Sequence, residues 1–275
     1  ATDMGTGCDT ILTQMAAECL DCEMSDIIVH GVDTDISPYD CGSYASSTTY
    51  VTGMAVIKTC ESLRKKICER GAEYLGCSAD DVEFDGQNVT NLKTGESISR
   101  QEIGNRVMCF NNEALSASEA FSSPTSPPPF MVGIAEVEVD KETGVAEMVD
   151  YVAVVDCGTV VNPALARVQT EGGIAQGIGM ALFEDIVYNS KGRNYSNSFM
   201  QYKIPSRLDV GTIRVEFESS YEPTGPFGAK SIGEIVINTP SPAISNAIQN
   251  ATGVIIRELP MTAEKIYRGI QEKKG

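Results

Sequence analysis

Apolar side chains recur at helical spacing in two segments of the first hundred residues. One segment covers residues 8–22. The other follows a turn and ends near Gly71 or Gly76, since glycine is the common residue just past a helix end. A spacing of three and four residues predicts two helices. Between them, the short apolar run at residues 27–29 predicts a strand.

Alternating apolar and polar residues indicate strands further along the chain. Residues 80–105 alternate weakly around two glycines and predict short strands with loops. Apolar runs at residues 131–139 and 152–155 flank a turn at residues 141–144, a pattern that predicts a hairpin. Residues 212–218 alternate again and predict one further strand.

Three more helices are expected in the second half of the chain. Asn162 and Pro163 form a favourable N-cap and first residue for a helix that ends near Phe183. The second of these helices is expected to end near Gly253, and the third is expected to begin at Thr262. Each glycine inside a helix costs about 1 kcal/mol relative to alanine, so another helix or a ligand is expected to approach the first helix closely. Its glycines are Gly172, Gly173, Gly177 and Gly179.

A proline-rich run divides the chain. Residues 122–129 end in three consecutive prolines, which can continue neither a helix nor a central strand. We interpret the run as an ordered crossing between two lobes, with a flexible linker as the alternative. The mixture of helices and strands predicts an α+β fold, with one α/β lobe at residues 1–121 and a second at residues 130–275.

Charge and hydropathy exclude two classes of partner. The 275 residues carry a formal net charge of −17, which disfavours binding to nucleic acid and to anionic membrane surfaces. No apolar run approaches the roughly 20 residues that a membrane-spanning helix needs. Nine cysteines include a single C-x-x-C, at Cys19 and Cys22, with no second pair or histidine cluster to complete a zinc site. Reduced thiols and a cytoplasmic location are therefore expected.

The most informative segment for chemistry is residues 223–234. Three glycines and two prolines lead to one carboxylate, Glu234, and the apolar residues 235–237 follow directly. Apolar neighbours would desolvate the carboxylate and favour its use as a general base. A solvated loop end is the alternative interpretation from composition alone.

The sequence of this segment resembles a segment found in a known protein family. Gly-Ala-Lys-Ser-Ile-Gly-Glu at residues 228–234 is similar to the loop that carries the catalytic glutamate in the molybdenum hydroxylases, the xanthine dehydrogenase and aldehyde oxidase family. Three segments resemble the family's cofactor loops in the same order. They are Asp-Met-Gly-Thr-Gly at residues 3–7, Gly-Ser-Tyr-Ala-Ser at residues 42–46 and Gln-Thr-Glu-Gly-Gly at residues 169–173.

The resemblance implies an enzyme and a catalytic residue. The chain is expected to be the C-terminal half of a two-lobed molybdopterin-binding subunit that hydroxylates a nitrogen heterocycle, such as a purine or a nicotinate-like ring, with oxygen from water. Glu234 would be the base. An aldehyde oxidoreductase, an aromatic thioester reductase of the same family and a non-catalytic assembly partner are the alternatives. The rest of the cofactor cage would come from a preceding segment or a partner subunit, so this piece alone is expected to be inactive.

The resemblance also implies the cofactor, molybdenum-molybdopterin, either alone or as a cytosine dinucleotide. Glycine-rich turns and helix N-termini offer N–H groups to its anionic parts, and a glutamine amide can read a pterin edge. The residues expected to bind it are Gly5, Thr6, Gly7, Ser43, Tyr44, Ala45, Ser46 and Gln169. Many relatives carry glutamine where this chain has Thr6, so backbone contact is expected there. No direct metal ligand is expected in this chain, and iron–sulfur clusters and FAD are expected on other domains or subunits.

Overall fold

The computed structural model describes residues 1–31, 33–40 and 42–274, and they form two compact units. The first unit comprises Ala1–Pro127 and Glu222–Ala229, and the second comprises Pro128–Tyr221 and Lys230–Gly275. The proline-rich run thus contains the first passage of the chain between units. Residues 222–229 return to the first unit, so one linear boundary does not describe the division.

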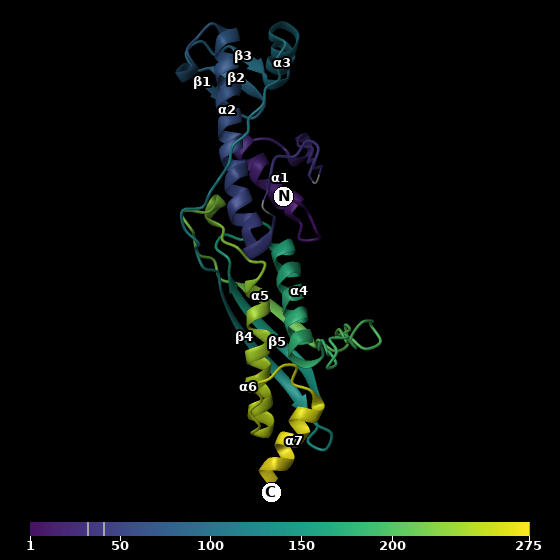
Figure 1. The fold of residues 1–275 in the computed structure, drawn as a ribbon. Helices are drawn as coiled ribbons and strands as arrows, with labels where there is room; N and C mark the ends of the chain where they lie inside the picture. Colours follow the sequence, from purple (N-terminus) through teal and green to yellow (C-terminus); the bar gives the residue numbers. More distant parts are fainter. Residues whose placement is uncertain (32, 41, 275) are drawn as a thin grey trace. The chain divides into compact units, whose positions relative to one another are not determined.

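Two helices form the centre of the first unit. Helix α1, Cys8–Leu20, packs against helix α2, Gly53–Leu75, as both were expected from the sequence (Figure 1). Helix α2 ends where Gly76 adopts a left-handed φ of 66°, a conformation that glycine adopts without steric cost. Buried Met15 lies on α1.

A small sheet packs on the end of α2. The antiparallel strands are β1, Val82–Phe84, β2, Asn88–Asn91, and β3, Ser97–Ser99. They lead into helix α3, Arg100–Arg106, which the weak alternation did not reveal. A local core is shared by the sheet, α3 and the residue after it, and it comprises Phe84, Val89, Ile98, Ile103 and Val107.

The prediction of a strand at residues 27–29 is wrong. A short 3₁₀ turn, Met24–Asp26, is followed by irregular backbone, and Ile28 is 93% exposed. A strand needs a neighbour to pair its backbone groups, and the described residues provide none for this run. Three apolar residues in a row were insufficient evidence for a strand.

The second unit is a three-stranded sheet covered by helices on one face. Strands β4, Phe130–Val139, and β5, Ala146–Asp156, form the expected hairpin, and β6, Thr212–Phe217, pairs parallel to β5. Buried Tyr151, Ala153 and Val155 of β5 face the core. The alternation along each strand therefore separates a buried face from an exposed one.

Four helices complete the second unit. They are α4, Pro163–Leu182, α5, Ile235–Asn238, α6, Pro240–Thr252, and α7, Ala263–Lys274 (Figure 1). Asn162 caps α4, because its side-chain oxygen accepts a hydrogen bond from the N–H of Leu165 at 3.1 Å. Helix α6 packs on β4, and α4 contacts both α5 and α6. Within the described part of the chain, every helix is too short or too polar to cross a bilayer.

Candidate functional site

Glu234 lies at the beginning of helix α5 in the second unit. Its side chain is exposed, whereas Val236, two residues later, is completely buried. The apolar residues 235–237 form a helical turn, so only one of them is directed fully into the core. The desolvation that the sequence led us to expect at Glu234 is therefore not found within this chain.

Lys230, four residues before Glu234, is held by a buried ion pair. The Lys230 side chain is only 7% exposed, and its Nζ lies 2.7 Å from Oδ2 of Asp156. Nζ also donates to the carbonyl oxygen of Pro128 at 3.3 Å and lies 5.3 Å from the ring centre of Phe130. The backbone N–H of Lys230 donates to the carbonyl of Cys157 at 2.7 Å. Both the side chain and the backbone of Lys230 are therefore fixed.

Asp156 accepts hydrogen bonds from three directions at the end of β5. Besides Lys230, its donors are the hydroxyl of Ser220, at 2.6 Å, and the N–H of Gly158, at 2.9 Å. Burial alone would raise the pKa of the Asp156 carboxyl, but these hydrogen bonds and the charge of Lys230 outweigh it, so the pKa lies below its usual value. The carboxylate form is therefore favoured in the folded protein.

Residues 222–229 are held by hydroxyl groups and close packing in the first unit. The hydroxyl of buried Tyr50 lies 2.7 Å from that of Thr224, and the Thr224 hydroxyl donates to Glu222 at 2.5 Å. Pro226 packs against Gly53 at the start of α2, where an added Cβ would lie 2.9 Å from the proline ring. Hydroxyl groups and close packing fix this part of the motif.

The glycines of α4 allow other helices to approach closely. A Cβ at Gly173 would lie 2.1 Å from Cγ2 of Val236, and one at Gly177 would lie 2.6 Å from the ring of Pro240. The sequence led us to expect either another helix or a ligand close to these glycines, and these two positions confirm a close helix. Gln169 is half-buried and lies one turn before Gly173, on the face of α4 that meets α5. The second unit thus places Gln169 and Glu234 on neighbouring helices.

The glycine loop at residues 3–7 already satisfies its own N–H groups. The Asp3 carboxylate accepts hydrogen bonds from Gly5 at 2.8 Å and Gly7 at 3.2 Å, and also from Asp9. The N–H of Gly5 makes the largest contribution to lowering the pKa of Asp3. These donors, which we expected to face an anion, therefore face a carboxylate. The loop remains open on its outer side, since a Cβ at Gly5 would meet no atom within 4 Å.

The second predicted cofactor loop has an unusual backbone. Ala45 and Ser46 adopt left-handed φ values of 51° and 57°, which residues with a Cβ rarely adopt. Such backbone strain is concentrated at functional sites in proteins. The Ser43 hydroxyl accepts a hydrogen bond from Thr48 at 2.7 Å, and Tyr44 is 69% exposed. The loop leads through a π-helical turn into α2, as expected.

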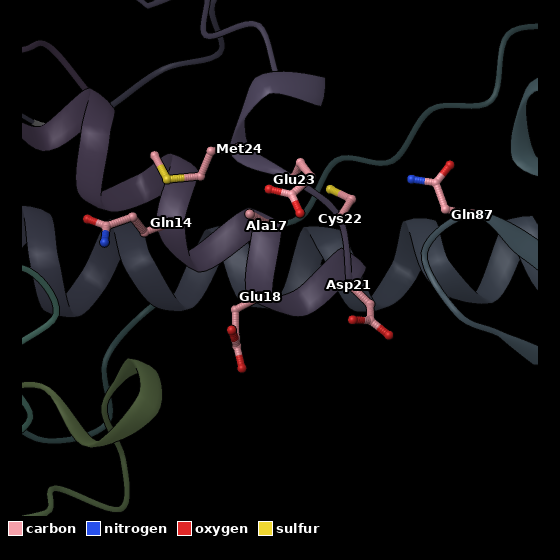
Figure 2. A pocket seen from close by; sticks show the side chains of 8 residues that line it. All are labelled: Gln14, Ala17, Glu18, Asp21, Cys22, Glu23, Met24 and Gln87. Carbon is pink, nitrogen blue, oxygen red and sulfur yellow. The ribbon is translucent and has the colours of Figure 1, made fainter.

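A separate cavity lies in the first unit, at the end of α1. Its volume is about 520 Å³, and three carboxylates, Glu18, Asp21 and Glu23, contribute to its wall (Figure 2). None of the residues predicted to bind the cofactor lines it. An anionic ligand such as a pterin pyrophosphate would be repelled by this wall.

The described cysteines are free thiols, and they occur in both units. They are Cys8, Cys19, Cys22, Cys60, Cys68, Cys77, Cys109 and Cys157. Cys41 lies outside the described residues. Burial raises the pKa of Cys157 to about 11, so this thiol next to Asp156 is protonated at neutral pH.

The lysine, the aspartate and the tyrosine that hold the motif were not identified from the sequence. Asp156 lies 74 residues before Lys230, and Tyr50 lies 174 residues before Thr224. One signal was available, because Lys230 stands in a segment of glycines and apolar residues, where a lysine that becomes buried needs a partner. The identity of that partner depends on the tertiary fold.

Comparison with known proteins identifies the class to which this site belongs. The sequence profile of the molybdopterin cofactor-binding domain matches residues 1–211, most of the chain. The chain therefore belongs to this family, whose relatives include xanthine dehydrogenases and aldehyde oxidoreductases, and thus to the molybdenum hydroxylases.

Individual relatives agree with this assignment. The probable hypoxanthine oxidase XdhD of Escherichia coli K12 is 36% identical over 98% of this chain and 28% of its own length. The gamma subunit of the 6-hydroxypseudooxynicotine dehydrogenase complex of Paenarthrobacter nicotinovorans is 31% identical over 98% of this chain and 35% of its own. The crystal structure of quinoline 2-oxidoreductase from Pseudomonas putida 86 superposes with a TM-score of 0.88 at 27% identity, covering 98% and 36% of the two chains. The chain spans about a third of these relatives, and the α+β fold is shared.

Proposed function

We propose that this chain is part of the molybdenum cofactor-binding subunit of an enzyme that hydroxylates a nitrogen heterocycle with oxygen from water. The observation that carries this proposal is the motif at residues 228–234, whose lysine is buried and ion-paired while its glutamate is exposed at a helix start. Three relatives bear the names of nitrogen heterocycles: hypoxanthine, nicotine and quinoline. An aldehyde is the second candidate substrate, because the aldehyde oxidoreductase subunit PaoC of Escherichia coli K12 is 30% identical.

The residues of this chain fit a molybdopterin in part. In the loop Ser43, Tyr44, Ala45 and Ser46, three residues are small, none is buried, and Ala45 and Ser46 have left-handed backbone before a helix, a geometry that suits an anionic group. Gln169 offers an amide beside α5. Gly5, Thr6 and Gly7 provide an open backbone surface, but the N–H groups of the two glycines are held by Asp3. We assign this loop a packing contact with the cofactor rather than phosphate binding.

In this proposal Glu234 is the general base. The bound cofactor would supply Lewis acidity and the two-electron redox change of the reaction. A carboxylate oxygen of Glu234 accepts the proton that leaves the water-derived hydroxyl group, and the exposed position at the start of α5 leaves the carboxylate accessible to a reacting group. Gln169, one turn from the contact with α5, orients the pterin by hydrogen bonds from its side-chain amide.

The remainder of the site would come from outside this chain. The chain spans 28–36% of the relatives described above, and the face of the second unit's sheet opposite the helices exposes several apolar side chains. They are Phe130, Val132, Ile134 and Val154, with exposed fractions of 60%, 65%, 65% and 42%. Such a row is typical of a surface covered by further protein. We propose that the rest of the molybdenum-binding subunit covers it, and that iron–sulfur and flavin groups reside on other domains or subunits.

The test is to purify the complex from its source through this chain and to measure its molybdenum content, its pterin content and its activity. About one molybdenum and one released pterin per chain, together with oxidation of a purine or pyridine-type ring, is the expected result. An intact complex without molybdenum would instead favour the assembly-partner alternative. Gln169→Ala is expected to reduce pterin retention in the same preparation, and full retention would remove Gln169 from the cofactor contacts.

A further inference from the structure

We propose that Lys230 and Asp156 act as a positioning pair that determines where the carboxylate of Glu234 lies. The inference rests on the proposed role of Glu234 as a base. Neither residue would touch the substrate or the cofactor. They would act through residues 231–233, which connect Lys230 to Glu234.

Lys230 is restrained at both its backbone and its side chain. Its Nζ reaches Asp156 at 2.7 Å and the carbonyl of Pro128 at 3.3 Å, and its N–H reaches the carbonyl of Cys157 at 2.7 Å. Because the backbone and the far end of the side chain bind different groups, Lys230 can neither shift along the chain nor rotate without losing a hydrogen bond. The position of its Cα is therefore well defined.

Asp156 is itself held firmly at the end of the sheet. It is the last residue of β5, and its neighbours Val155 and Cys157 are 0% and 4% exposed. Ser220 and Gly158 donate to the same carboxylate that receives Lys230. The carboxylate thus joins the end of the sheet to the motif, and it transfers the order of the packed core to a loop.

The chain is also fixed on the C-terminal side of Glu234. Val236 is completely buried and packs directly on Gly173 of α4. Glu234 therefore lies between two fixed points, one four residues before it and the other two residues after it. Only residues 231–233 and residue 235 connect Glu234 to these points, which leaves little freedom for its backbone.

An ion pair suits this task better than an apolar contact. Burying two charges costs about as much as their attraction returns, so such a pair adds little net stability. What it does add is direction, since charge-assisted hydrogen bonds are short and strongly dependent on geometry. Catalytic groups require such placement, and an error of about 1 Å can cost on the order of 100-fold in rate.

The experiment uses the complete enzyme and four variants. Lys230→Met keeps the length of the side chain without the charge, Asp156→Asn keeps the shape of the acceptor, and the double variant carries both changes. Arg268→Met is the matched control, because Arg268 forms an ion pair with Glu264 on α7 in which both side chains are exposed. We would measure kcat, KM, molybdenum content and amide hydrogen exchange of residues 231–236.

The expected result is a specific loosening of this segment. At exchange times too short for the core amides of α4 to exchange, amide exchange of residues 231–236 rises about tenfold or more in the two single variants, while the molybdenum content stays unchanged. The value of kcat falls on the order of 10- to 100-fold with KM within about twofold of wild type, as expected when only the transition state is affected. The double variant loses no more than either single variant, because the two residues act as one unit. Arg268→Met changes none of these values.

Unchanged exchange of residues 231–236 in Lys230→Met would overturn the proposal, whatever the activity. Additive losses in the double variant would overturn it as well. If wild-type enzyme has no hydroxylase activity, the proposed function fails, while the exchange data still decide whether the pair orders this segment. Should the single variants unfold, Ser220→Ala removes one hydrogen bond from Asp156 and is expected to give a smaller rise in exchange at the same residues.

Discussion

Two parts of one segment, residues 222–234, are held in different ways. Residues 222–229 belong to the first unit, where the buried hydroxyl of Tyr50 holds Thr224. Residues 230–234 belong to the second unit, where the charged pair of Lys230 and Asp156 holds the chain. The first part contains no residue proposed to do chemistry, whereas the second delivers Glu234.

The difference shows where strong restraint is concentrated. Neutral hydrogen bonds typically contribute about 1 kcal/mol each, and they tolerate the loss of one partner better than a buried pair does. Removal of one partner from a buried ion pair leaves a charge without compensation and costs several times more. The proposed catalytic part of the motif is thus the part whose contacts tolerate least change.

The largest effect is expected from removing the carboxylate that the second part delivers. Glu234→Gln in the complete enzyme should reduce kcat by about 100- to 10,000-fold, the usual contribution of a general base, with molybdenum content unchanged. Steady-state kinetics and metal analysis provide the measurement. Glu272→Gln, at an exposed position of α7, is the control and should retain activity. Near-normal turnover in Glu234→Gln would show that the base lies elsewhere.

The second-largest effect is expected from breaking the Lys230–Asp156 pair, and it can be compared with the loss of the Tyr50 hydroxyl. Asp156→Asn is expected to lower the free energy of unfolding by about 3–5 kcal/mol, because Lys230 is left buried without its partner. Tyr50→Phe should lower it by only about 1–2 kcal/mol, since the hydroxyl loses its hydrogen bond with Thr224 and two longer ones with Ser123 and Thr125 while the ring remains packed. Urea unfolding followed by circular dichroism gives both values. Equal losses would remove the distinction between the two parts.

Packing behind Glu234 can be tested with two adjacent glycines of α4. Gly173→Ala places a methyl group on Val236 and should destabilise the protein by about 1–3 kcal/mol. Gly172→Ala meets no atom within 4 Å and should stabilise the helix by about 0.5–1 kcal/mol. Thermal unfolding distinguishes the two substitutions. A neutral Gly173→Ala would mean that α5 can move away from α4 at little cost.

The smallest effect is one of pH. The pKa of Asp156 is lowered in the folded state, so its contribution to stability is complete above the unfolded value of about 3.9 and is lost as the pH falls below it. The stability difference between wild type and Asp156→Asn should therefore become smaller as the pH falls from about 4 to about 2. A constant difference over that range would contradict the assigned ionisation of Asp156.

Much of the fold was predictable because local signals agree with the tertiary structure. Gly76 ends α2 and Asn162 begins α4, each where the sequence placed a helix boundary, and β4 and β5 form the expected hairpin. The expected strand at residues 27–29 failed because pairing partners are not a local property. Helix α3 was missed because seven residues give too short a periodicity to recognise.

The candidate site was predictable only to the level of its segments. Sequence motifs indicated Glu234 and the loops, yet apolar neighbours in sequence did not bury Glu234, since a helical turn directs successive residues to different sides. The capture of the Gly5 and Gly7 N–H groups by Asp3 depends on how the loop folds back on itself. The partners of Lys230 and Thr224 depend on contacts between residues far apart in the chain, which periodicity does not record.

The central claim is hydroxylation with oxygen from water by the complete enzyme that contains this chain, and isotope labelling tests it most directly. Multiple turnovers of a nitrogen heterocycle in water enriched in oxygen-18, analysed by mass spectrometry, are predicted to give a hydroxylated product with the enrichment of the solvent. Product that contains oxygen-16 from dissolved oxygen gas would contradict the proposed chemistry and the role of Glu234 as its base.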